Sequence, residues 1–185
     1  MIEKGFANES GHFAGSIQTS ISREDQSSRR EKVVTRMGSM IIREATRSDV
    51  PGLVAVRVAV KENVLTSDIP QERIVAGLEV RGKGWVAEHE GQVVGFSTAD
   101  REESMIWALF LLPEWERKGL GSVLLERAVG WLWREGCERI WLTTEPGSRA
   151  EGFYAHLGWT RAGITDKGEV RFELQRPSLS SLGRA

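Results

Sequence analysis

A glycine-punctuated turn, Glu116–Ser122 (ERKGLGS), carries the residue types best suited to bind a phosphate. It follows the apolar run Met105–Leu112, which predicts a buried central strand, and precedes an amphipathic segment that predicts a helix. The first N–H groups of a helix have no intrahelical acceptor and lie at the positive end of its dipole, so they attract anions. Gly119 and Gly121 let the backbone approach a phosphate closely, and the adjoining Arg-Lys pair adds positive charge. The turn therefore predicts a pyrophosphate site.

Two common nucleotide motifs do not fit this turn. A dinucleotide fingerprint needs a third glycine where the chain has Leu124. A P-loop ends in Gly-Lys-Ser/Thr, whereas Gly121 is followed by Ser122 and Val123. The alternative without a ligand is a helix start at which two glycines permit close packing.

A second segment, Ala150–Trp159 (AEGFYAHLGW), contains the only tyrosine of the chain, Tyr154. Together the two segments resemble the signatures of the GNAT N-acetyltransferase superfamily. The first corresponds to its Gln/Arg-x-x-Gly-x-Gly/Ala loop with a Pro-Glu-aromatic lead-in, the second to Ala-x-x-Phe-Tyr followed by Gly-aromatic. The resemblance covers roughly residues 40–174. It departs at Glu116, where the family has Gln or Arg, and at Gly147, where many members carry Asn.

This resemblance implies a mixed α/β fold. The expected sheet is mostly antiparallel with six to seven strands, is flanked by about four helices, and splays apart between strands four and five. Acetyl-CoA is implied as co-substrate, with its pantetheine in the splay and no metal. The implied cofactor-binding residues are backbone groups of Phe110, Leu111 and Leu112 for the pantetheine, and of Arg117, Lys118, Gly119, Leu120, Gly121 and Ser122 for the pyrophosphate.

Tyr154 matches the family's tyrosine that protonates the departing CoA sulfur, so it is the expected general acid. The alternative role is that of a core phenol packed beside Phe153 and Trp159. For the general base we rank Glu145, after the fifth strand of the family fold, ahead of Glu102 and Glu103. A water chain is the alternative to any carboxylate.

The acceptor is expected to be a primary amine on a small molecule or a peptide. Specificity is expected from the first two helices and from segments 64–71 and 163–169. Trp107 is a candidate for lining an apolar acceptor pocket, and Arg149 and Arg171 are candidates for binding an acidic group of the acceptor. Ordinary core packing and solvent exposure are the competing roles of these three side chains.

Hydrophobic periodicity predicts the elements that position these residues. Strands alternate with helices, and an early hairpin turns at Glu90-Gly91, which indicates a mixed sheet. The predicted strands are Met40–Glu44, Trp85–His89, Gln92–Ala99, Met105–Leu112, Arg139–Thr144, Trp159–Ala162 and Val170–Leu174. The predicted helices begin near Ser48, at Pro70, near Leu120 and at Ser148, and Gly136 is expected to end the third.

Composition sets the outer limits. With 185 residues, 40% hydrophobic and 28% charged, the chain suits one domain, expected at 40–176, with a disordered extension at 1–39 and a frayed tail at 177–185. A net charge of −1 predicts no nucleic-acid partner, and the short apolar runs predict no membrane span. A single cysteine, Cys137, favours a reducing compartment, hence the cytoplasm. The exposed strand edges are compatible with a homodimer.

Three functions remain open on these grounds. The leading one is acetyl-CoA-dependent N-acetyltransferase activity, in which a primary amine attacks the acetyl group directly in a ternary complex. The second is a CoA-binding module without catalysis, compatible with the departures at Glu116 and Gly147. The third is another nucleotide-binding or interaction domain, which the two failed motifs and the second signature make weakest.

Overall fold

The protein is represented by a computed structural model that describes residues 31–35, 38–60 and 70–177. This part of the chain contains eight strands and four α-helices, and α2 continues into a π-helical turn, Gly77–Arg81. The strands are β1 (Glu31–Thr35), β2 (Gly38–Glu44), β3 (Gly82–His89), β4 (Gln92–Asp100), β5 (Met105–Leu111), β6 (Arg139–Thr144), β7 (Thr160–Ile164) and β8 (Val170–Gln175). The helices are α1 (Val50–Ala59), α2 (Gln71–Ala76), α3 (Leu120–Arg134) and α4 (Arg149–His156).

All strands belong to one sheet with the order β1-β2-β3-β4-β5-β6-β8-β7. Every neighbouring pair is antiparallel except β5 and β6, which are parallel. The mixed, mostly antiparallel sheet with four flanking helices is therefore confirmed. The strand count is eight rather than six to seven, because β1 adds a strand at the outer edge.

β1 lies inside segment 1–39, which the sequence predicted to be an extension outside the domain. It pairs with β2 from Glu31 opposite Ile42 to Thr35 opposite Gly38. The sheet thus begins before the expected boundary at residue 40. The predicted disorder of residues 1–30 and fraying of residues 178–185 lie outside the described residues.

The local turn signals of the sequence correspond to real ends of elements. Glu90 and Gly91 both have positive φ, 49° and 80°, as a tight hairpin turn of the primed type requires. Helix α3 ends at Arg134, and Gly136 follows with φ 92°, the left-handed conformation common after a helix C-terminus.

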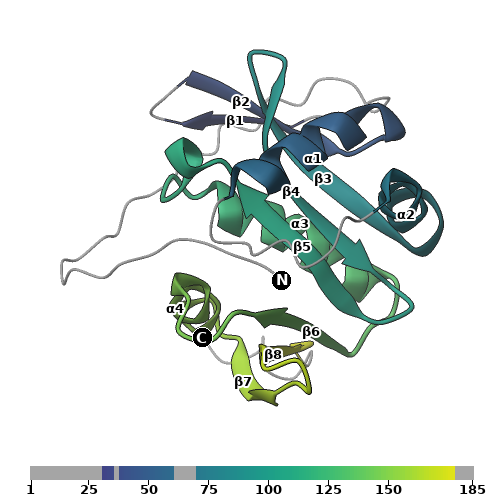
Figure 1. The fold of residues 1–185 in the computed structure, drawn as a ribbon, viewed down its shortest axis with the longest axis vertical. Coiled ribbons are helices and arrows are strands. Elements are labelled where there is room, and N and C mark those ends of the chain that lie inside the picture. The colour runs from purple at the N-terminus through teal and green to yellow at the C-terminus, as the bar shows by residue number, and fades with distance from the viewer. Residues whose placement is uncertain (1–30, 36–37, 61–69, 178–185) are drawn as a thin grey trace.

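The parallel neighbours β5 and β6 separate almost at once. Their only registered pair is Met105 with Trp141, supported by a hydrogen bond of 3.1 Å from the Trp141 N–H to the Ser104 carbonyl. On the β4 side, Thr98 pairs with Ala108 but Ala99 pairs with Ile106, which leaves Trp107 as an extra residue in a bulge of β5. Bulges bend and twist the strand that contains them. Counted from β2, these are the fourth and fifth strands, so the predicted splay is present; in Figure 1, β6, β7, β8 and α4 form a separate lower group.

Two apolar layers cover the sheet. Buried residues of α3 and α4 pack on one face, in a cluster that includes Leu111, Leu124 and Leu142 and so spans both sides of the β5–β6 gap. On the other face, α1 and α2 pack over β3, β4 and β5 in a cluster that includes Leu53 and Phe110 and has no buried member beyond β5. The first layer holds the two halves of the sheet together, whereas the second belongs to the N-terminal half.

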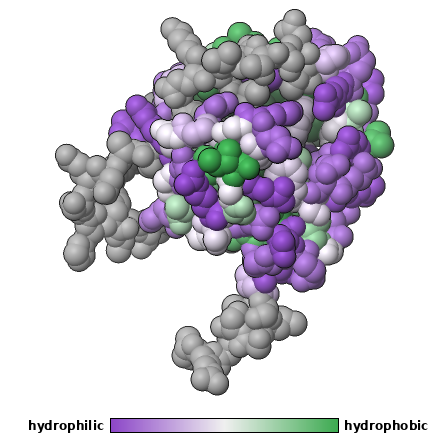
Figure 2. Space-filling view, turned by 60° about the horizontal axis from the view of Figure 1, so that its bottom comes forward, coloured by the Kyte–Doolittle hydropathy of each residue, from purple (hydrophilic) through white to green (hydrophobic). Residues whose placement is uncertain are grey.

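The visible surface is mostly hydrophilic. Figure 2, which turns the bottom of Figure 1 toward the viewer, shows a small hydrophobic area near the centre of this face, surrounded by hydrophilic residues. Among the described helices, none combines the length and the apolar character that crossing a bilayer requires.

One polar cluster fixes the start of α1 on the sheet. Arg43 of β2 donates both terminal nitrogens to Asp49, at 2.7 and 2.8 Å, and its Nε to Glu88 of β3 at 2.8 Å. Asp49 also accepts the Thr46 N–H at 2.8 Å. The Arg43 hydrogen bonds hold the pKa of the Asp49 carboxyl below its ordinary value of 3.8, and the same pair raises the pKa of Arg43.

Replacing this carboxylate, Asp49→Asn, is expected to lower the free energy of unfolding by about 2 kcal/mol at pH 7, since it breaks charge-assisted hydrogen bonds at a buried position. Because the folded pKa of Asp49 is depressed, its contribution is present above about pH 4 and is lost as the pH falls through the folded value. The stability difference between wild type and variant should therefore shrink at pH 3, as measured by urea unfolding. Glu79→Gln at the exposed Arg47–Glu79 pair is the control with little expected effect. Equal stability of Asp49→Asn and wild type at pH 7 would contradict this role.

Candidate functional site

The glycine turn leads directly from β5 into α3. After the short helical turn Pro113–Trp115, Arg117 adopts φ 56° and Gly119 φ 81°, two left-handed residues within three positions. Gly119 is the N-cap of α3, and the first intrahelical bond joins the Val123 N–H to its carbonyl at 3.2 Å. The N–H groups of Leu120, Gly121 and Ser122 precede this bond, so the helix supplies no acceptor for them. An anion at this end would meet oriented donors and the positive end of the dipole.

The two cations of the turn differ in their surroundings. Lys118 donates to the Glu114 carbonyl, and its ammonium lies 4.7 Å from the ring centroid of Trp115. The ring of Trp115, in turn, lies 4.7 Å from that of His89. Lys118 therefore helps to fold the turn, whereas the exposed Arg117 is the more accessible cation.

Gly121 lies between β5 and α4. A Cβ built there would lie 3.5 Å from Cδ1 of Leu111 and 3.6 Å from Cζ of Phe153, both ordinary contacts. A methyl group fits, but a larger side chain would push apart two residues of the apolar layer. Gly121 thus has a packing role in addition to any role in binding.

Strand alternation decides which backbone groups of β5 face the gap. The Leu112 N–H donates to the Val94 carbonyl of β4 at 2.9 Å, and Phe110 is paired with Phe96. Because hydrogen-bonded and non-bonded positions alternate in an antiparallel pair, Leu111 and Leu109 direct their backbone groups away from β4, toward the gap. Of the three predicted residues, Leu111 meets the gap with its backbone, and Leu109 was not predicted.

Tyr154 is buried in α4, with only 1% of its surface exposed. Its ring packs against those of Phe153, Trp159 and Phe172, with centroid distances between 5.1 and 5.9 Å. The packing role considered from the sequence is therefore real. The role of its hydroxyl in catalysis stays a prediction.

The predicted carboxylates lie in different places. Glu145 is exposed just after β6. Glu102 and Glu103 lie in the β4–β5 turn and face Arg81, at 3.2 and 3.9 Å. None of the three lines the cavity described next, and the assignment of the base stays a prediction.

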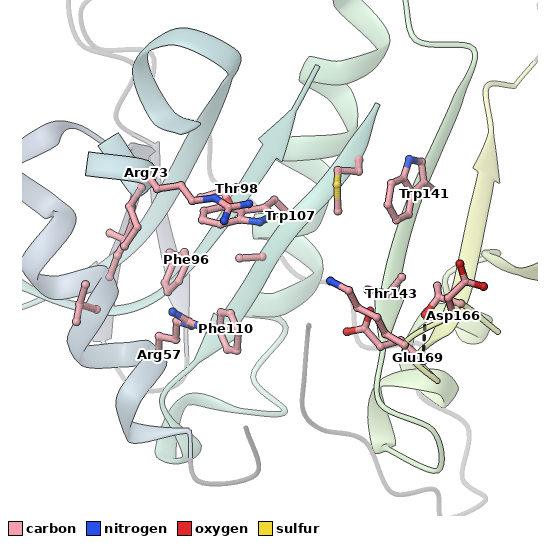
Figure 3. A pocket seen from close by; sticks show the side chains of 17 residues that line it. Arg57, Arg73, Phe96, Thr98, Trp107, Phe110, Trp141, Thr143, Asp166 and Glu169 are labelled. Carbon is pink, nitrogen blue, oxygen red and sulfur yellow. Dashed lines mark hydrogen bonds between the residues drawn. The ribbon is translucent and has the colours of Figure 1, made fainter. Parts of the chain in front are cut away.

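A cavity of about 470 Å³ lies on the α1–α2 face, across the mouth of the gap (Figure 3). Its apolar floor includes Phe96 of β4 and Trp107 and Phe110 of β5, so the candidate Trp107 does line an apolar pocket. Trp141 and Thr143 of β6 form the far side. Its volume is within the range of small-molecule sites, roughly 300–1,000 Å³.

Charged residues occupy opposite walls of this cavity. Arg57 of α1 and Arg73 of α2 lie on one side, and Asp166 and Glu169 of the β7–β8 loop lie on the other (Figure 3). The sequence had indicated both helices and segment 163–169 as sources of specificity, but it had not singled out these four residues. The only sequence feature that these four residues share is that each lies in a segment expected near the acceptor.

The arginines that the sequence did single out are elsewhere. Arg171 of β8 hydrogen-bonds Glu173 at 3.1 Å and stacks over Trp141 at 4.3 Å. Arg149 is exposed at the start of α4. Neither lines the cavity. Within the described ranges, no group of three or more His, Cys, Asp or Glu side chains is arranged to hold a metal ion.

The mixed sheet with the glycine turn at the start of α3 has the fold of known acetyltransferases. The sequence profile described as "Acetyltransferase (GNAT) family" matches residues 58–159, more than half of the chain. The chain belongs to this family.

Solved structures agree with this fold. The GNAT domain of S. lividans PAT superposes with a TM-score of 0.65 at 21% identity, over 80% of this chain and 97% of that one. PaiA N-acetyltransferase of Thermoplasma acidophilum, in complex with coenzyme A, gives 0.62 at 16% identity, over 75% and 99%. An N-acetyltransferase of Staphylococcus aureus Mu50 gives 0.62 at 19%, over 74% and 98%. At such identities these similarities show the fold alone.

The turn geometry yields a direct test at Gly119. Gly119→Ala must place a Cβ on a left-handed residue, at a cost of roughly 1–2 kcal/mol, or change the turn. We expect acetyl-CoA affinity, measured by calorimetry, to fall about tenfold or more in a variant that remains folded by circular dichroism. Gly136→Ala is the matched control, since Gly136 also has positive φ (92°) with nothing within 4 Å of a built Cβ and follows the opposite end of α3. Equal loss of affinity in both variants would mean that strain, and not the turn, is responsible.

Proposed function

We propose that the protein is an acetyl-CoA-dependent N-acetyltransferase that moves the acetyl group to a primary amine by direct attack in a ternary complex. The observation that carries this proposal is the position of three features around one gap. β5 and β6 pair only at Met105–Trp141, the glycine turn leads from the far end of β5 to the N-terminus of α3, and the cavity on the α1–α2 face is lined by residues of both strands. A candidate phosphate site and a candidate acceptor pocket thus both adjoin the β5–β6 gap.

The residues present fit acetyl-CoA. The N–H groups of Leu120, Gly121 and Ser122 suit its pyrophosphate, and Arg117 supplies an accessible charge beside them. The outward backbone groups of Leu109 and Leu111 suit an extended amide chain, as an added strand would. When bound, acetyl-CoA supplies the activated acetyl group as a thioester. The neighbour crystallised with coenzyme A supports this choice of co-substrate by analogy.

The chain's own contribution to catalysis is orientation and proton handling. Holding both reactants in one complex removes part of the entropic barrier. Donors directed into the gap polarise the carbonyl on which negative charge develops. We assign Tyr154 as the general acid for the leaving thiolate, on its match to the family motif and its position on α4 beside the gap.

The amine must lose a proton, to a carboxylate or to a chain of water molecules. Glu145 follows β6 and remains our sequence-based candidate. Asp166 and Glu169 line the cavity itself, so they are the carboxylates nearest to a bound acceptor. The acceptor is a small molecule or a peptide, and we expect the protein to act in the cytoplasm, without nucleic acid or membrane. A homodimer is compatible with the two strands at the ends of the sheet, β1 and β7.

The first experiment is a calorimetric titration of the folded protein with acetyl-CoA, with NAD and ATP as controls. We expect saturable binding of acetyl-CoA alone, followed by release of free thiol when amines are added. Absence of binding in folded protein would overturn the proposal. Binding without thiol release for any amine would favour a CoA-binding module without catalysis.

Tyr154→Phe tests the general acid, because it keeps the ring that packs against Phe153, Trp159 and Phe172 and removes only the hydroxyl. We expect turnover to fall about 10²-fold or more while acetyl-CoA affinity and the thermal midpoint stay close to those of wild type. Unchanged turnover would leave Tyr154 with its packing role alone.

A further inference from the structure

The cavity on the α1–α2 face is electrically asymmetric. Its helical wall carries Arg57 and Arg73, whereas the β7–β8 loop presents Asp166 and Glu169 with one intervening cation, Lys167. Figure 3 shows Arg73 extending from α2 toward the strand that carries Trp107. No acidic side chain pairs with Arg73 within the described residues. Its guanidinium is therefore available to an anion in the cavity.

A second, independent feature lies beneath it. Thr98 of β4 lines the same cavity, is only 3% exposed, and its hydroxyl has no hydrogen-bond partner in the structure. A buried hydroxyl without a partner destabilises a protein by roughly 1–3 kcal/mol, so such groups are uncommon unless a water molecule or a ligand completes them. Phe96, two residues earlier, faces the same cavity. The polar group thus lies in an otherwise apolar wall, as expected of a specificity contact.

We propose that the acceptor is a small amine that also carries a carboxylate. Arg73 and the Thr98 hydroxyl bind the carboxylate, the apolar body lies against Trp107 and Phe96, and the ammonium group faces the acidic β7–β8 loop. This assignment rests on the proposed function. A guanidinium offers a carboxylate two parallel hydrogen bonds, and a hydroxyl can donate a third.

The walls favour a small molecule over a protein chain. The cavity is bounded by α1 and α2 on one side and by β6 and the β7–β8 loop on the other, with about 470 Å³ between them. An internal lysine or the N-terminal residue of a protein has no free α-carboxylate beside its amine, because that carboxyl is part of a peptide bond. Its amide carbonyl would leave the charge of Arg73 without a counterion.

The reaction balances without a further reactant. The amine nitrogen forms a bond to the acetyl carbon as the carbon–sulfur bond breaks. One ammonium proton leaves before attack and is released to solvent, the second proton leaves the new amide nitrogen, and the thiolate of CoA takes up one proton. The products are an N-acetylamino carboxylate, CoA and one proton in solution.

Matched substrates test the proposal. Phenylalanine, phenylalaninamide and phenethylamine share one aromatic body, but only the first has a carboxylate; the amide imitates a protein N-terminus. The pair 6-aminohexanoate and hexylamine repeats the comparison for a substrate whose amine is far from its carboxylate. The analogue 1-amino-2-phenylethylphosphonate tests whether the site prefers a phosphonate to a carboxylate. In at least one series we expect kcat/KM for the carboxylate to exceed that of its neutral partner about tenfold or more. The proposal would be overturned if the neutral or amide compound had the higher kcat/KM in both series, or if the phosphonate had a higher kcat/KM than phenylalanine.

Two variants place the effect at the proposed contacts. Arg73→Gln should bring the preference for the carboxylate over the neutral amine close to one, mainly by raising KM for the carboxylate substrate. Arg134→Gln is the control, because Arg134 is exposed on α3, which covers the opposite face of the sheet. This variant should keep the full preference for the carboxylate. Thr98→Val should raise KM for the carboxylate roughly fivefold and leave the thermal midpoint unchanged or higher, since it removes an unsatisfied buried hydroxyl. A lower midpoint with unchanged KM would assign Thr98 to packing alone.

A binding measurement separates the two levels of the proposal. Saturation-transfer NMR with phenylalanine and phenethylamine, in the presence of CoA, reports acceptor binding without turnover. Carboxylate-selective binding that Arg73→Gln abolishes would support the acceptor class even if acetyl transfer failed. Acetyl transfer to neutral amines with no such selectivity would keep the enzyme function and reject the carboxylate.

Discussion

The rest of the structure depends on a single point of pairing between two parallel strands. β5 and β6 join at Met105 and Trp141 and then diverge, while each remains paired with its other neighbour, except at the Trp107 bulge of β5. Backbone N–H and C=O groups require partners, so an interior strand edge that is left open is costly unless something completes it. A strand-like ligand between two strands needs about 4.7–4.9 Å on each side, which only the wide end of such a wedge supplies. The bulge at Trp107 bends β5 at the place where the separation begins.

The sequence predicted most elements because their signals are local. The Glu90-Gly91 turn, the apolar strand before the glycine turn and the amphipathic α3 each depend on neighbouring residues, and all are present. β1 was missed because its segment shows no sustained apolar period, and its pairing with β2 does not depend on one. The bulge at Trp107 was missed because register is set by the partner strand, which a single segment does not reveal.

The two parts of the site also differ in how far the sequence predicts them. The phosphate-binding turn is continuous in sequence, so glycine spacing and the basic pair indicated it directly. The cavity is assembled from α2, β4, β5 and the β7–β8 loop, and its polar contacts have no common motif. Thr98 is an ordinary strand residue until the fold buries its hydroxyl, and Arg73 is an exposed arginine that differs from others only in lining the cavity. Such residues become recognisable only when burial and partners are known.

The unequal cover of the two faces makes the gap directional. The α3–α4 layer spans both halves of the sheet and closes one side of the gap, whereas the α1–α2 layer ends at β5 and leaves the cavity on the other side. A planar trigonal carbon held between the strands would turn one of its two faces toward packed side chains and the other toward the cavity. The proposed transfer is therefore stereofacially restricted, although its product has no new stereocentre. The amine is expected to attack from the α1–α2 face, because the α1–α2 layer does not extend across the β5–β6 gap.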